Sequence, residues 1–364
     1  MNTLAPPTHL PQQLVSSATA AAMIRSGAAL VIAGDAAVLA ALPDGLWIGG
    51  TIPYFMGQDG GVTTQEQVFV TPLPHYPGFT PTIRQYDRAS LSQVCAEAPA
   101  NGFSLVILPA FSEVHLEYAQ HAPLYDDMFM KPLVGWVAGI HLDDLGNAEP
   151  KVRDGRQAML FDNRAVVMHV PLPDHVSANV NIVNLFSQSQ GDVITFPGSG
   201  FEATSCLVNG KPTSLAAYLQ RIGHDPRLPL VTNHSGALVN VSIKATDAVQ
   251  DNVQFYGPVF PHVEYRLAQA FTGSYENALD QVIAHLPDQA TFSCNCVLNY
   301  LYCELEGKRT GHLTGPMTFG EIAYVLLNQT VVHLTLETYG QQVIDNAAQP
   351  RPTNGMLVAM MVMN

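Results

Sequence analysis

Apolar residues recur along the chain in short runs that alternate between helical and strand-like spacing. In the first half, helical spacing is found at residues 12–26, 36–42, 91–98 and 112–122, and strand-like apolar runs lie between them. The run at residues 103–109 is continuously apolar, which is typical of a strand buried on both faces of a sheet. Ser112 is a candidate N-cap for the helix that follows, and Pro123 is expected to end it. Such alternation predicts an α/β fold.

The second half shows the same mixture and an internal echo of the first. Residues 158–169 resemble residues 323–333: in each, an apolar strand turns at an Asn and returns through two Val residues towards a His. Asn tolerates the left-handed backbone of tight turns, so both stretches are interpreted as hairpins. The echo fits either a true duplication or a chance likeness between two hairpins. Duplication predicts two related halves, each with a mixed β-sheet flanked by helices, stacked as a layered sandwich.

The strand pattern restarts between residues 174 and 203, and we place the boundary between the halves there. The expected organisation is an N-terminal extension at residues 1–24, a first half at 25–190, a second half at 191–345 and an apolar tail at 346–364. The tail is apolar enough for an edge strand or an interface contact.

Charge and composition narrow the classes of partner. Charged residues make up only 13% of the chain, against about 25% in an average soluble domain. A surface with so few charges favours self-association, so we expect a homo-oligomer. The formal net charge is −14 and no run of basic residues occurs, which argues against nucleic acid as a partner.

Features of membrane and secreted proteins are missing from the sequence. No segment reaches the ~18 consecutive apolar residues that a membrane-spanning helix needs, and residues 1–13 contain no Lys or Arg, unlike a secretory signal. Five cysteines are an odd number in a large chain, so a disulfide framework is not indicated. These observations predict a cytoplasmic protein without a membrane span.

The last third of the chain carries the most distinctive motifs. A strand ending in Cys294 is followed by an apolar helix at 297–306, the segment Thr318-Phe319-Gly320-Glu321-Ile322, and a strand beginning Asn328-Gln329-Thr330. This order resembles the C-terminal portion of FIST domains (F-box and intracellular signal transduction). Looser similarities lie at residues 48–51, 133–139, 208–212 and 253–259, so the resemblance spans roughly residues 25–340, with a FIST N-like first half and a FIST C-like second half.

The resemblance implies a sensory domain that binds a small molecule. The length leaves no room for a kinase, cyclase or receptor module, so we expect a stand-alone sensor that acts through a downstream signalling protein. The Arg that commonly follows the Cys in the family is absent after Cys294, and Phe319 stands where Tyr is usual. The family's ligand therefore cannot be transferred, and an amino acid or another metabolite is the expected class.

Six residues are predicted to contribute to the ligand site, in a pocket between the halves or at the ends of the sheets. The first half contributes Gly135, which lets a ligand approach the backbone, and Trp136, which offers a stacking face. The second half contributes Cys294, Thr318, Gly320 and Glu321. Glu321 is either an acceptor for a cationic ligand or a structural partner of turn amides.

Two further functions remain as alternatives. Thirteen histidines, among them His115 and His121 on one predicted helix, leave open a haem-based gas sensor, although most of these histidines are expected at the surface. Cys294 or Cys296 near a helix N-terminus leaves open a cysteine-dependent enzyme, because the helix dipole favours a thiolate. The spacing of Cys294, Cys296, Cys303 and His312 is poor for zinc, and no catalytic constellation is recognised, so neither a metal site nor an enzyme is expected.

Overall fold

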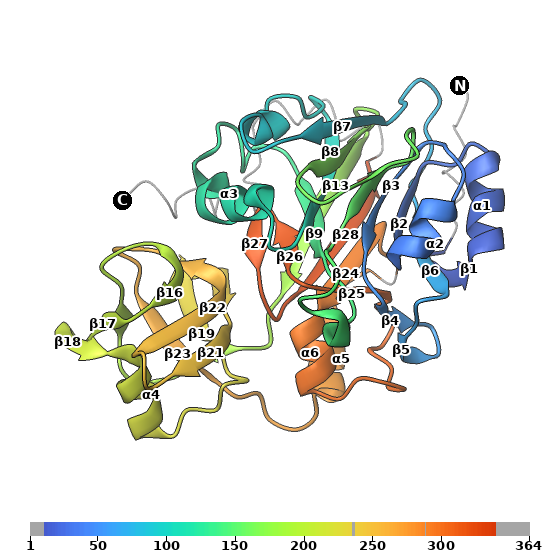
Figure 1. The fold of residues 1–364 in the computed structure, drawn as a ribbon. Coiled ribbons are helices and arrows are strands. Elements are labelled where there is room, and N and C mark those ends of the chain that lie inside the picture. Colours follow the sequence, from blue (N-terminus) through green and yellow to red (C-terminus); the bar gives the residue numbers. More distant parts are fainter. Residues whose placement is uncertain (1–10, 235–236, 288, 340–364) are drawn as a thin grey trace.

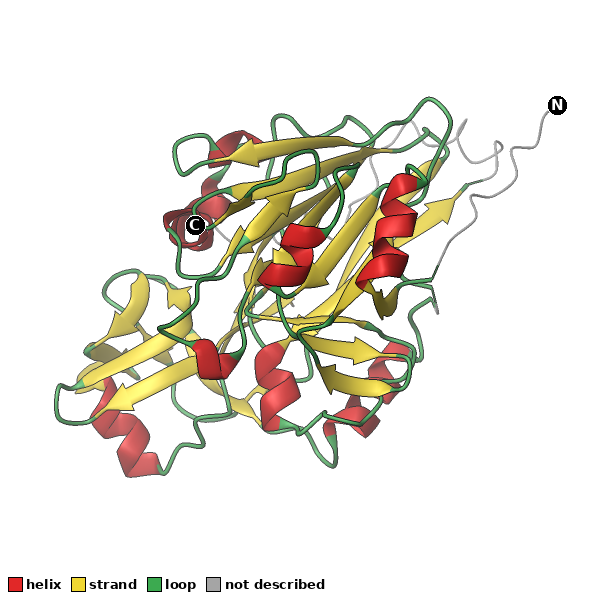
Figure 2. Ribbon diagram, turned by 45° about the vertical axis from the view of Figure 1, so that its right-hand side comes forward, coloured by secondary structure: helices red, strands yellow, loops and turns green. Residues whose placement is uncertain are grey.

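The computed structural model describes residues 11–234, 237–287 and 289–339, and shows a large body with a smaller β-rich unit beside it (Figures 1 and 2). We call residues 187–269 the inserted unit and the remaining described residues the body. Three mixed sheets form the body, which confirms the α/β class. None of the helices in the described ranges is long and apolar enough to cross a membrane.

The first sheet has six strands in the order β1-β6-β2-β3-β10-β11. Its neighbouring helices begin at side-chain caps: Ser16 accepts from the amide of Thr19, and Asp35 from that of Ala37. Leu30 and Ile32 pack towards these helices, while Val31 and Ala33 alternate into the main core. The elements are β1 (Gln13–Ser16), α1 (Ser17–Arg25), β2 (Leu30–Gly34), α2 (Ala36–Ala41), β3 (Trp47–Thr51), β6 (Gln67–Pro72), β10 (Val152–Asp154) and β11 (Leu160–Phe161).

The second sheet, in the order β27-β26-β9-β8-β12-β7, contains the expected central strand. Every residue of β8 and β9 is buried, and Ser112 caps the helix α3 by accepting from the amide of His115. The α-helix ends before Pro123, as expected, and Pro123 lies in the short 3-10 helix that follows it. The elements are β7 (Thr82–Tyr86), η1 (Leu91–Val94), β8 (Gly102–Pro109), α3 (Glu113–His121), η2 (Ala122–Leu124), β9 (Leu133–Ala138), η3 (Leu142–Asp144), β12 (Ala165–Pro171), β26 (Glu321–Ala323) and β27 (Val325–Leu327).

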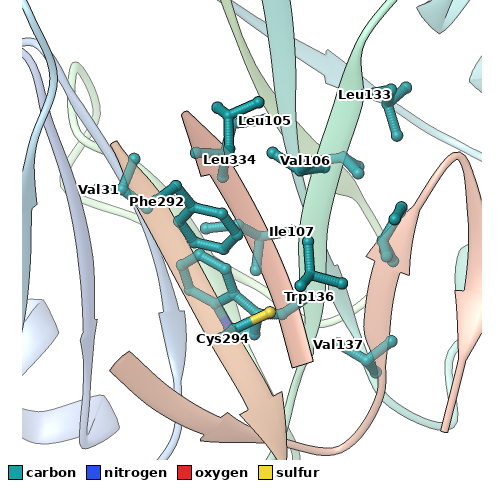
Figure 3. Packing of buried hydrophobic residues seen from close by; sticks show 14 of the residues in the cluster. Val31, Leu105, Val106, Ile107, Leu133, Trp136, Val137, Phe292, Cys294 and Leu334 are labelled. Carbon is teal, nitrogen blue, oxygen red and sulfur yellow. The ribbon is translucent and has the colours of Figure 1, made fainter. Parts of the chain in front are cut away.

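The third sheet, in the order β13-β28-β24-β25-β4-β5, joins strands from both ends of the chain. Its elements are β4 (Tyr54–Gly57), β5 (Gly60–Thr63), β13 (Val176–Val183), α5 (Tyr275–Ile283), β24 (Phe292–Cys296), α6 (Val297–Tyr302), β25 (Gly315–Thr318) and β28 (Val331–Thr338). It packs against the second sheet around Trp136 of β9 and Phe292 of β24, whose rings are stacked at 5.8 Å between centroids (Figure 3).

The inserted unit has its own apolar core, which includes Phe196, Phe255 and Tyr265. Two sheets form it, one in the order β18-β17-β15-β23-β19-β20 with β14 beside β23, the other in the order β16-β22-β21. Its elements are β14 (Ser187–Gln188), β15 (Ile194–Thr195), β16 (Gly200–Ala203), β17 (Ser205–Val208), β18 (Lys211–Ser214), α4 (Leu215–Ile222), β19 (Leu230–His234), β20 (Ala237–Val241), β21 (Ile243–Asp247), β22 (Asn252–Val259) and β23 (Tyr265–Gln269).

Three strand–helix–strand units organise the body. The pairs β2–β3, β8–β9 and β24–β25 are parallel, and α2, α3 and α6 respectively connect them. The segments that follow the carboxyl ends of β8, β9, β24 and β25 all face the inserted unit across the cavities described below.

Two predicted hairpins and one predicted helix start were wrong. The two stretches read as hairpins are not hairpins: β11 pairs with β10 in the first sheet while β12 pairs with β7 and β8 in the second, and β27 pairs with β26 while β28 pairs with β13 and β24. In both places the chain passes from one sheet to the next, because each strand pairs with strands that are distant in the sequence. The helix expected from residue 12 begins only at Ser17, since Gln13–Ser16 pairs with β6. The tail expected at residues 346–364 lies outside the described residues.

Candidate functional site

Four of the six predicted site residues meet where β9 pairs with β26. In this antiparallel pair, Trp136 is opposite Glu321 and Gly135 is opposite Ile322. The amide of Val137 donates to the carbonyl of Gly320 at 2.8 Å. The long-range pairing of two strands therefore brings Gly135, Trp136, Gly320 and Glu321 together.

The other two residues join the same junction through hydrogen bonds. The Cys294 thiol donates to the carbonyl of Gly135 at 3.5 Å. Thr318 Oγ1 lies 3.2 Å from the carbonyl of Asn295 and 3.1 Å from that of Gly320. All six residues are buried, and none of them lines either of the two large cavities described below.

Gly135 and Trp136 serve the packing of this junction. A Cβ atom on Gly135 would lie 1.8 Å from the carbonyl oxygen of Val106, so glycine is required by the close approach of β8. Trp136 stacks on Phe292 at an interplanar angle of 14°, with Cys294 beside the indole (Figure 3). The Trp136 Nε1 has no hydrogen-bond partner among the described residues.

Glu321 is a fully buried carboxyl group with an internal partner. Its Oε2 accepts from the amide of Thr330 at 3.0 Å and from the Thr330 hydroxyl at 2.8 Å, whereas Oε1 has no partner among the described residues. Burial raises the pKa of Glu321 to about 8 against the opposing effect of the Thr330 hydrogen bonds. The carboxyl group is therefore predominantly protonated at neutral pH and carries no charge for a cationic ligand.

The cysteines are thiols rather than thiolates. Cys296 is the N-cap of α6, but burial and the nearby Glu321 raise its pKa well above the usual value, and burial does the same for Cys294. Burial also raises the pKa of Cys95 to about 12 and of Cys206 and Cys303 to about 11. Desolvation outweighs the helix dipole here, so the thiolate favoured by the sequence argument does not form at neutral pH.

An apolar cavity of about 440 Å³ opens between the body and the inserted unit. We call it the apolar cavity. The segments that follow the carboxyl ends of four strands supply its body side: Ala110 and Phe111 after β8, Leu142 and Leu145 after β9, Val297, Leu298 and Leu301 after β24, and Phe319 after β25. Helix α3 adds His115 and Leu116, and the inserted unit closes the other side with Phe201, Glu202, Lys244, Gln254, Phe255 and Tyr256.

Phe111 adopts an unusual backbone conformation at the rim of the apolar cavity. Its φ of 66° lies in the left-handed region, which is a genuine outlier for a bulky residue. The side chain is 55% exposed, with its ring edge-to-face against Phe319 at 6.2 Å between centroids. The Lys244 ammonium group lies 5.7 Å from the centre of the Phe111 ring.

His115 is a buried polar group that also lines the apolar cavity. It is only 7% exposed, and its ring packs edge-to-face against Phe201 of the inserted unit at 6.1 Å. Nδ1 accepts from the amide of Phe111 at 3.3 Å, and Nε2 has no partner among the described residues. Burial lowers the pKa of His115 to about 4, so the imidazole is neutral at physiological pH.

A second cavity of about 720 Å³, the wide cavity, lies at the other end of α3. It is lined by the end of α3 and η2, including His121 and Leu124, by Phe129, by Val325 and Leu326 of β27, and by Asn240, His262 and Val263 of the inserted unit. His121 Nδ1 lies 3.1 Å from Glu117 Oε1.

Amide side chains link the inserted unit to the body beside the wide cavity, which Asn240 and Asn328 line. Asn240 and Asn184 exchange two hydrogen bonds of 2.8 and 3.0 Å, and Asn240 Nδ2 also donates to the carbonyl of Asn328 at 3.1 Å. The hydroxyl of Ser242 donates to Gln329 Oε1 at 2.7 Å.

Haem does not fit the apolar cavity with His115 as its ligand. Because Nδ1 accepts a hydrogen bond, the proton of the neutral ring is on Nε2, which then has no lone pair for iron. Within the described parts of the chain, no group of three or more His, Cys, Asp or Glu side chains is placed to hold a metal ion.

Sequence reasoning missed the residues of the apolar cavity. Phe319 was noted only as a departure from a pattern, and His115 was placed on a helix but not recognised as buried. His169 and His333 are the other two buried histidines among the described residues whose burial the structure gives, and the remaining ones are half-buried or exposed. The available signal was local: Phe111 stands two residues after a buried strand and precedes the helix cap Ser112, a place where an exposed aromatic residue is unusual.

Comparison with known proteins gives a family without an assigned role. No curated protein matches the sequence. The resemblance to FIST domains is tested by neither result and stays a prediction. The model of a family of unknown function, DUF6976, matches residues 15–337. The chain belongs to this family, DUF6976.

Proposed function

We propose that this protein is a non-enzymatic sensor that binds a small molecule in the apolar cavity and acts through a partner protein. The observation that carries the proposal is the position of this cavity, where the segments following β8, β9, β24 and β25 converge. In α/β proteins, ligands bind outside the carboxyl ends of parallel strands, because the loops there can vary without disturbing the sheet. A volume of about 440 Å³ lies within the range of small-molecule sites.

The two-sided construction of the cavity supports a sensory role. Body and inserted unit have separate apolar cores, and each supplies one side of the cavity. A ligand that contacts both sides favours the arrangement in which they are closest, so binding shifts the population of arrangements. A partner protein that binds only this arrangement would then respond to the presence of the ligand.

The finer predictions from the sequence belong to this proposal. They are FIST membership, two related halves in a layered sandwich, a cytoplasmic location, a homo-oligomer, and an amino acid or another metabolite as ligand. The predicted junction of Gly135, Trp136, Cys294, Thr318, Gly320 and Glu321 holds β25 and β26 in place, and Phe319 between them contributes directly to the cavity. In this proposal the six residues act as the support of the site.

A thermal-shift screen with two cavity variants tests the proposal. Metabolites that bind the native protein raise its melting temperature. Leu145→Trp, at a residue 48% exposed on the rim, fills the apolar cavity and should abolish the shift. Leu124→Trp, at a residue 64% exposed in the wide cavity, is the matched control and should retain it. A screen without any hit at millimolar concentration, or a hit lost only in Leu124→Trp, would contradict the proposal.

The wide cavity favours haem sensing as a second candidate. The carboxylate of Glu117 beside His121 Nδ1 is the arrangement that orients a ligating imidazole and leaves Nε2 to the metal. Haem there would supply binding of a diatomic gas, while His121 would hold it and the buried Phe129 would exclude water from one side. Haemin added to the protein should then give a Soret band that His121→Ala removes and that His75→Ala, outside both cavities, preserves. A protein that stays colourless rules this candidate out.

A further inference from the structure

The two charged side chains that line the apolar cavity have opposite signs and come from one small sheet of the inserted unit. We infer that the cavity takes an apolar α-amino acid as a zwitterion. Its carboxylate lies at Lys244, its ammonium group at Glu202, and its side chain among the apolar residues of the body. This inference rests on the proposed function and names the chemical class of its ligand.

The first step is the register of the sheet β16-β22-β21. Glu202 of β16 and Ala245 of β21 are both opposite Gln254 of β22, one on each side of it. The register of β21 with β22 shifts between Ile243 and Ala245, so Lys244 is the extra residue of a β-bulge. A bulge redirects a side chain out of the ordinary alternation of a strand. Lys244 lines the same cavity as Glu202 and Gln254.

The second step is the spacing and the freedom of the two charges. Lys244 and Glu202 are on the outer strands of three, whose backbones lie roughly 10 Å apart. Both side chains are exposed, and neither forms an ion pair with a described residue. The Lys244 ammonium group lies 5.7 Å from the centre of the Phe111 ring, which belongs to the body. The Glu202 carboxylate accepts one hydrogen bond of 3.0 Å, from Asn252.

The third step is the charge that the cavity selects. A carboxylate is attracted by Lys244 and repelled by Glu202, and a lone ammonium group meets the opposite pair of effects. A molecule that carries both charges gains both attractions. In an α-amino acid the two groups are attached to one carbon. With charge-assisted hydrogen bonds of about 2.8 Å on either side, they can bridge side chains on strands this far apart.

The net charge of the chain acts in the same direction. A formal charge of −14 repels a plain organic anion, whereas a zwitterion has no net charge and avoids this repulsion. The cavity therefore favours an α-amino acid over the corresponding carboxylic acid.

The fourth step is the body side of the cavity, which receives the side chain of the ligand. Apart from His115, the body residues that line the cavity are apolar. Phe111, Leu145 and Leu301 among them are 55%, 48% and 37% exposed, so apolar surface remains for a ligand to cover. A ligand held by its charges at the inserted unit and by its side chain at the body contacts both units, as the proposed sensor requires.

The test compares L-phenylalanine with two compounds that each lack one charge. Hydrocinnamate has the same skeleton without the ammonium group, and 2-phenylethylamine has it without the carboxylate. Dissociation constants are measured by ligand-observed NMR at one ionic strength. The wild-type protein should bind phenylalanine about three- to tenfold more tightly than either compound, the effect of one charge-assisted contact at an exposed site. L-leucine, 4-methylpentanoate and 3-methylbutylamine repeat the comparison for an aliphatic side chain.

Two variants assign the charges. Lys244→Met should lower the affinity for the amino acid by a similar factor without weakening the amine, and Glu202→Gln should lower it without weakening the carboxylic acid. Both residues are exposed, so neither change should affect folding. Lys211→Met and Glu66→Gln, at exposed residues outside both cavities, are the matched controls and should retain wild-type affinities.

Three results would overturn the inference. They are amino acids that bind no more tightly than the compounds with one charge, equal affinities in the cavity variants and their controls, and no binding of either amino acid at millimolar concentration. A screening hit that Leu145→Trp blocks and that both Lys244→Met and Glu202→Gln leave intact would overturn this inference while the proposed function stands. A screen without any hit removes both.

Discussion

Phe111 shows how one residue can be placed for binding at the expense of stability. Its left-handed backbone costs about 1–2 kcal/mol for a residue with a side chain, and its ring is more exposed than buried. This backbone conformation places the Phe111 ring at the apolar cavity, against Phe319. It also directs the Phe111 amide to Nδ1 of His115, which fixes the tautomer of that histidine. Strain of this kind collects at functional sites.

Replacing Phe111 by asparagine should separate stability from binding. Asparagine tolerates the left-handed region and keeps the backbone amide, so the relief of strain offsets the lost ring contacts, and the free energy of unfolding should change by less than about 1 kcal/mol. The affinity for a ligand found in the thermal-shift screen should fall severalfold, because Phe111 lines the apolar cavity. Met130→Asn, at a residue 71% exposed and outside both cavities, is the control and should leave affinity unchanged. Urea unfolding and NMR titration measure the two effects, and an unchanged affinity in Phe111→Asn would count against the role of this ring.

Glu321 should make stability depend on pH above neutrality. Its folded-state pKa of about 8 lies above the 4.5 of an unperturbed glutamate, so the folded protein binds the proton more tightly than the unfolded chain. The contribution of Glu321 to the free energy of unfolding is then highest below about pH 4.5 and falls as pH rises towards 8. Between about pH 6.5 and pH 8 the fall is at most about 2 kcal/mol.

Urea unfolding of wild type and Glu321→Gln across that window measures this effect. The window avoids the opposite contributions of His115, His169 and His333, whose pKa values burial lowers to about 4. The glutamine variant should lose the slope, because it has no proton to release. Parallel pH profiles for the two proteins would show that Glu321 does not titrate as described.

At the scale of elements, local signals in the sequence predicted local structure well. The continuous apolar run gave strand β8, and Ser112 gave the start of α3, because burial on both faces and side-chain capping leave direct traces in the sequence. The sequence contains no comparable local signal for which strands pair with each other in a sheet. The strand at Val325–Leu327 pairs with β26, while Val331–Thr338 pairs with β13 and β24, so an apparent hairpin became a crossing between sheets.

The same limit applies to the candidate site. The motif around Gly320 and Glu321 correctly indicated residues that come together, since their strands pair with β9. What it could not indicate was the apolar cavity, because this depends on how the inserted unit lies against α3 and α6. Only Phe319 belongs to both the motif and the cavity.

The amide link between the units should control local opening. Asn240 is 2% exposed and bonds both Asn184 and the carbonyl of Asn328, so Asn240→Ala leaves buried groups unpaired and should cost about 1–3 kcal/mol. Hydrogen exchange should accelerate at residues 184–188 and 269–274, which connect the inserted unit to the body. Asn252→Ala, whose bond to Glu202 stays within the inserted unit, is the control. Equal exchange rates in the two variants would show that Asn240 does not hold the inserted unit to the body.

At the scale of the whole molecule, two apolar cores meet across a boundary that holds both cavities. Within the described residues, one core extends through the three sheets of the body and another fills most of the inserted unit. Units with separate cores move relative to one another unless a large apolar interface joins them. Here the boundary contains cavities, amide bonds and one small apolar cluster around Phe186, Val231 and Ala268, which suits a ligand that stabilises one arrangement.

Hydrogen exchange of the complete protein with and without a ligand from the screen tests the binding site most directly. We expect slower exchange in the peptides covering residues 110–116, β16, β22 and α6, the elements around the apolar cavity. Slower exchange confined to residues 119–124 and 258–264 around the wide cavity, or no change in either region, would contradict it.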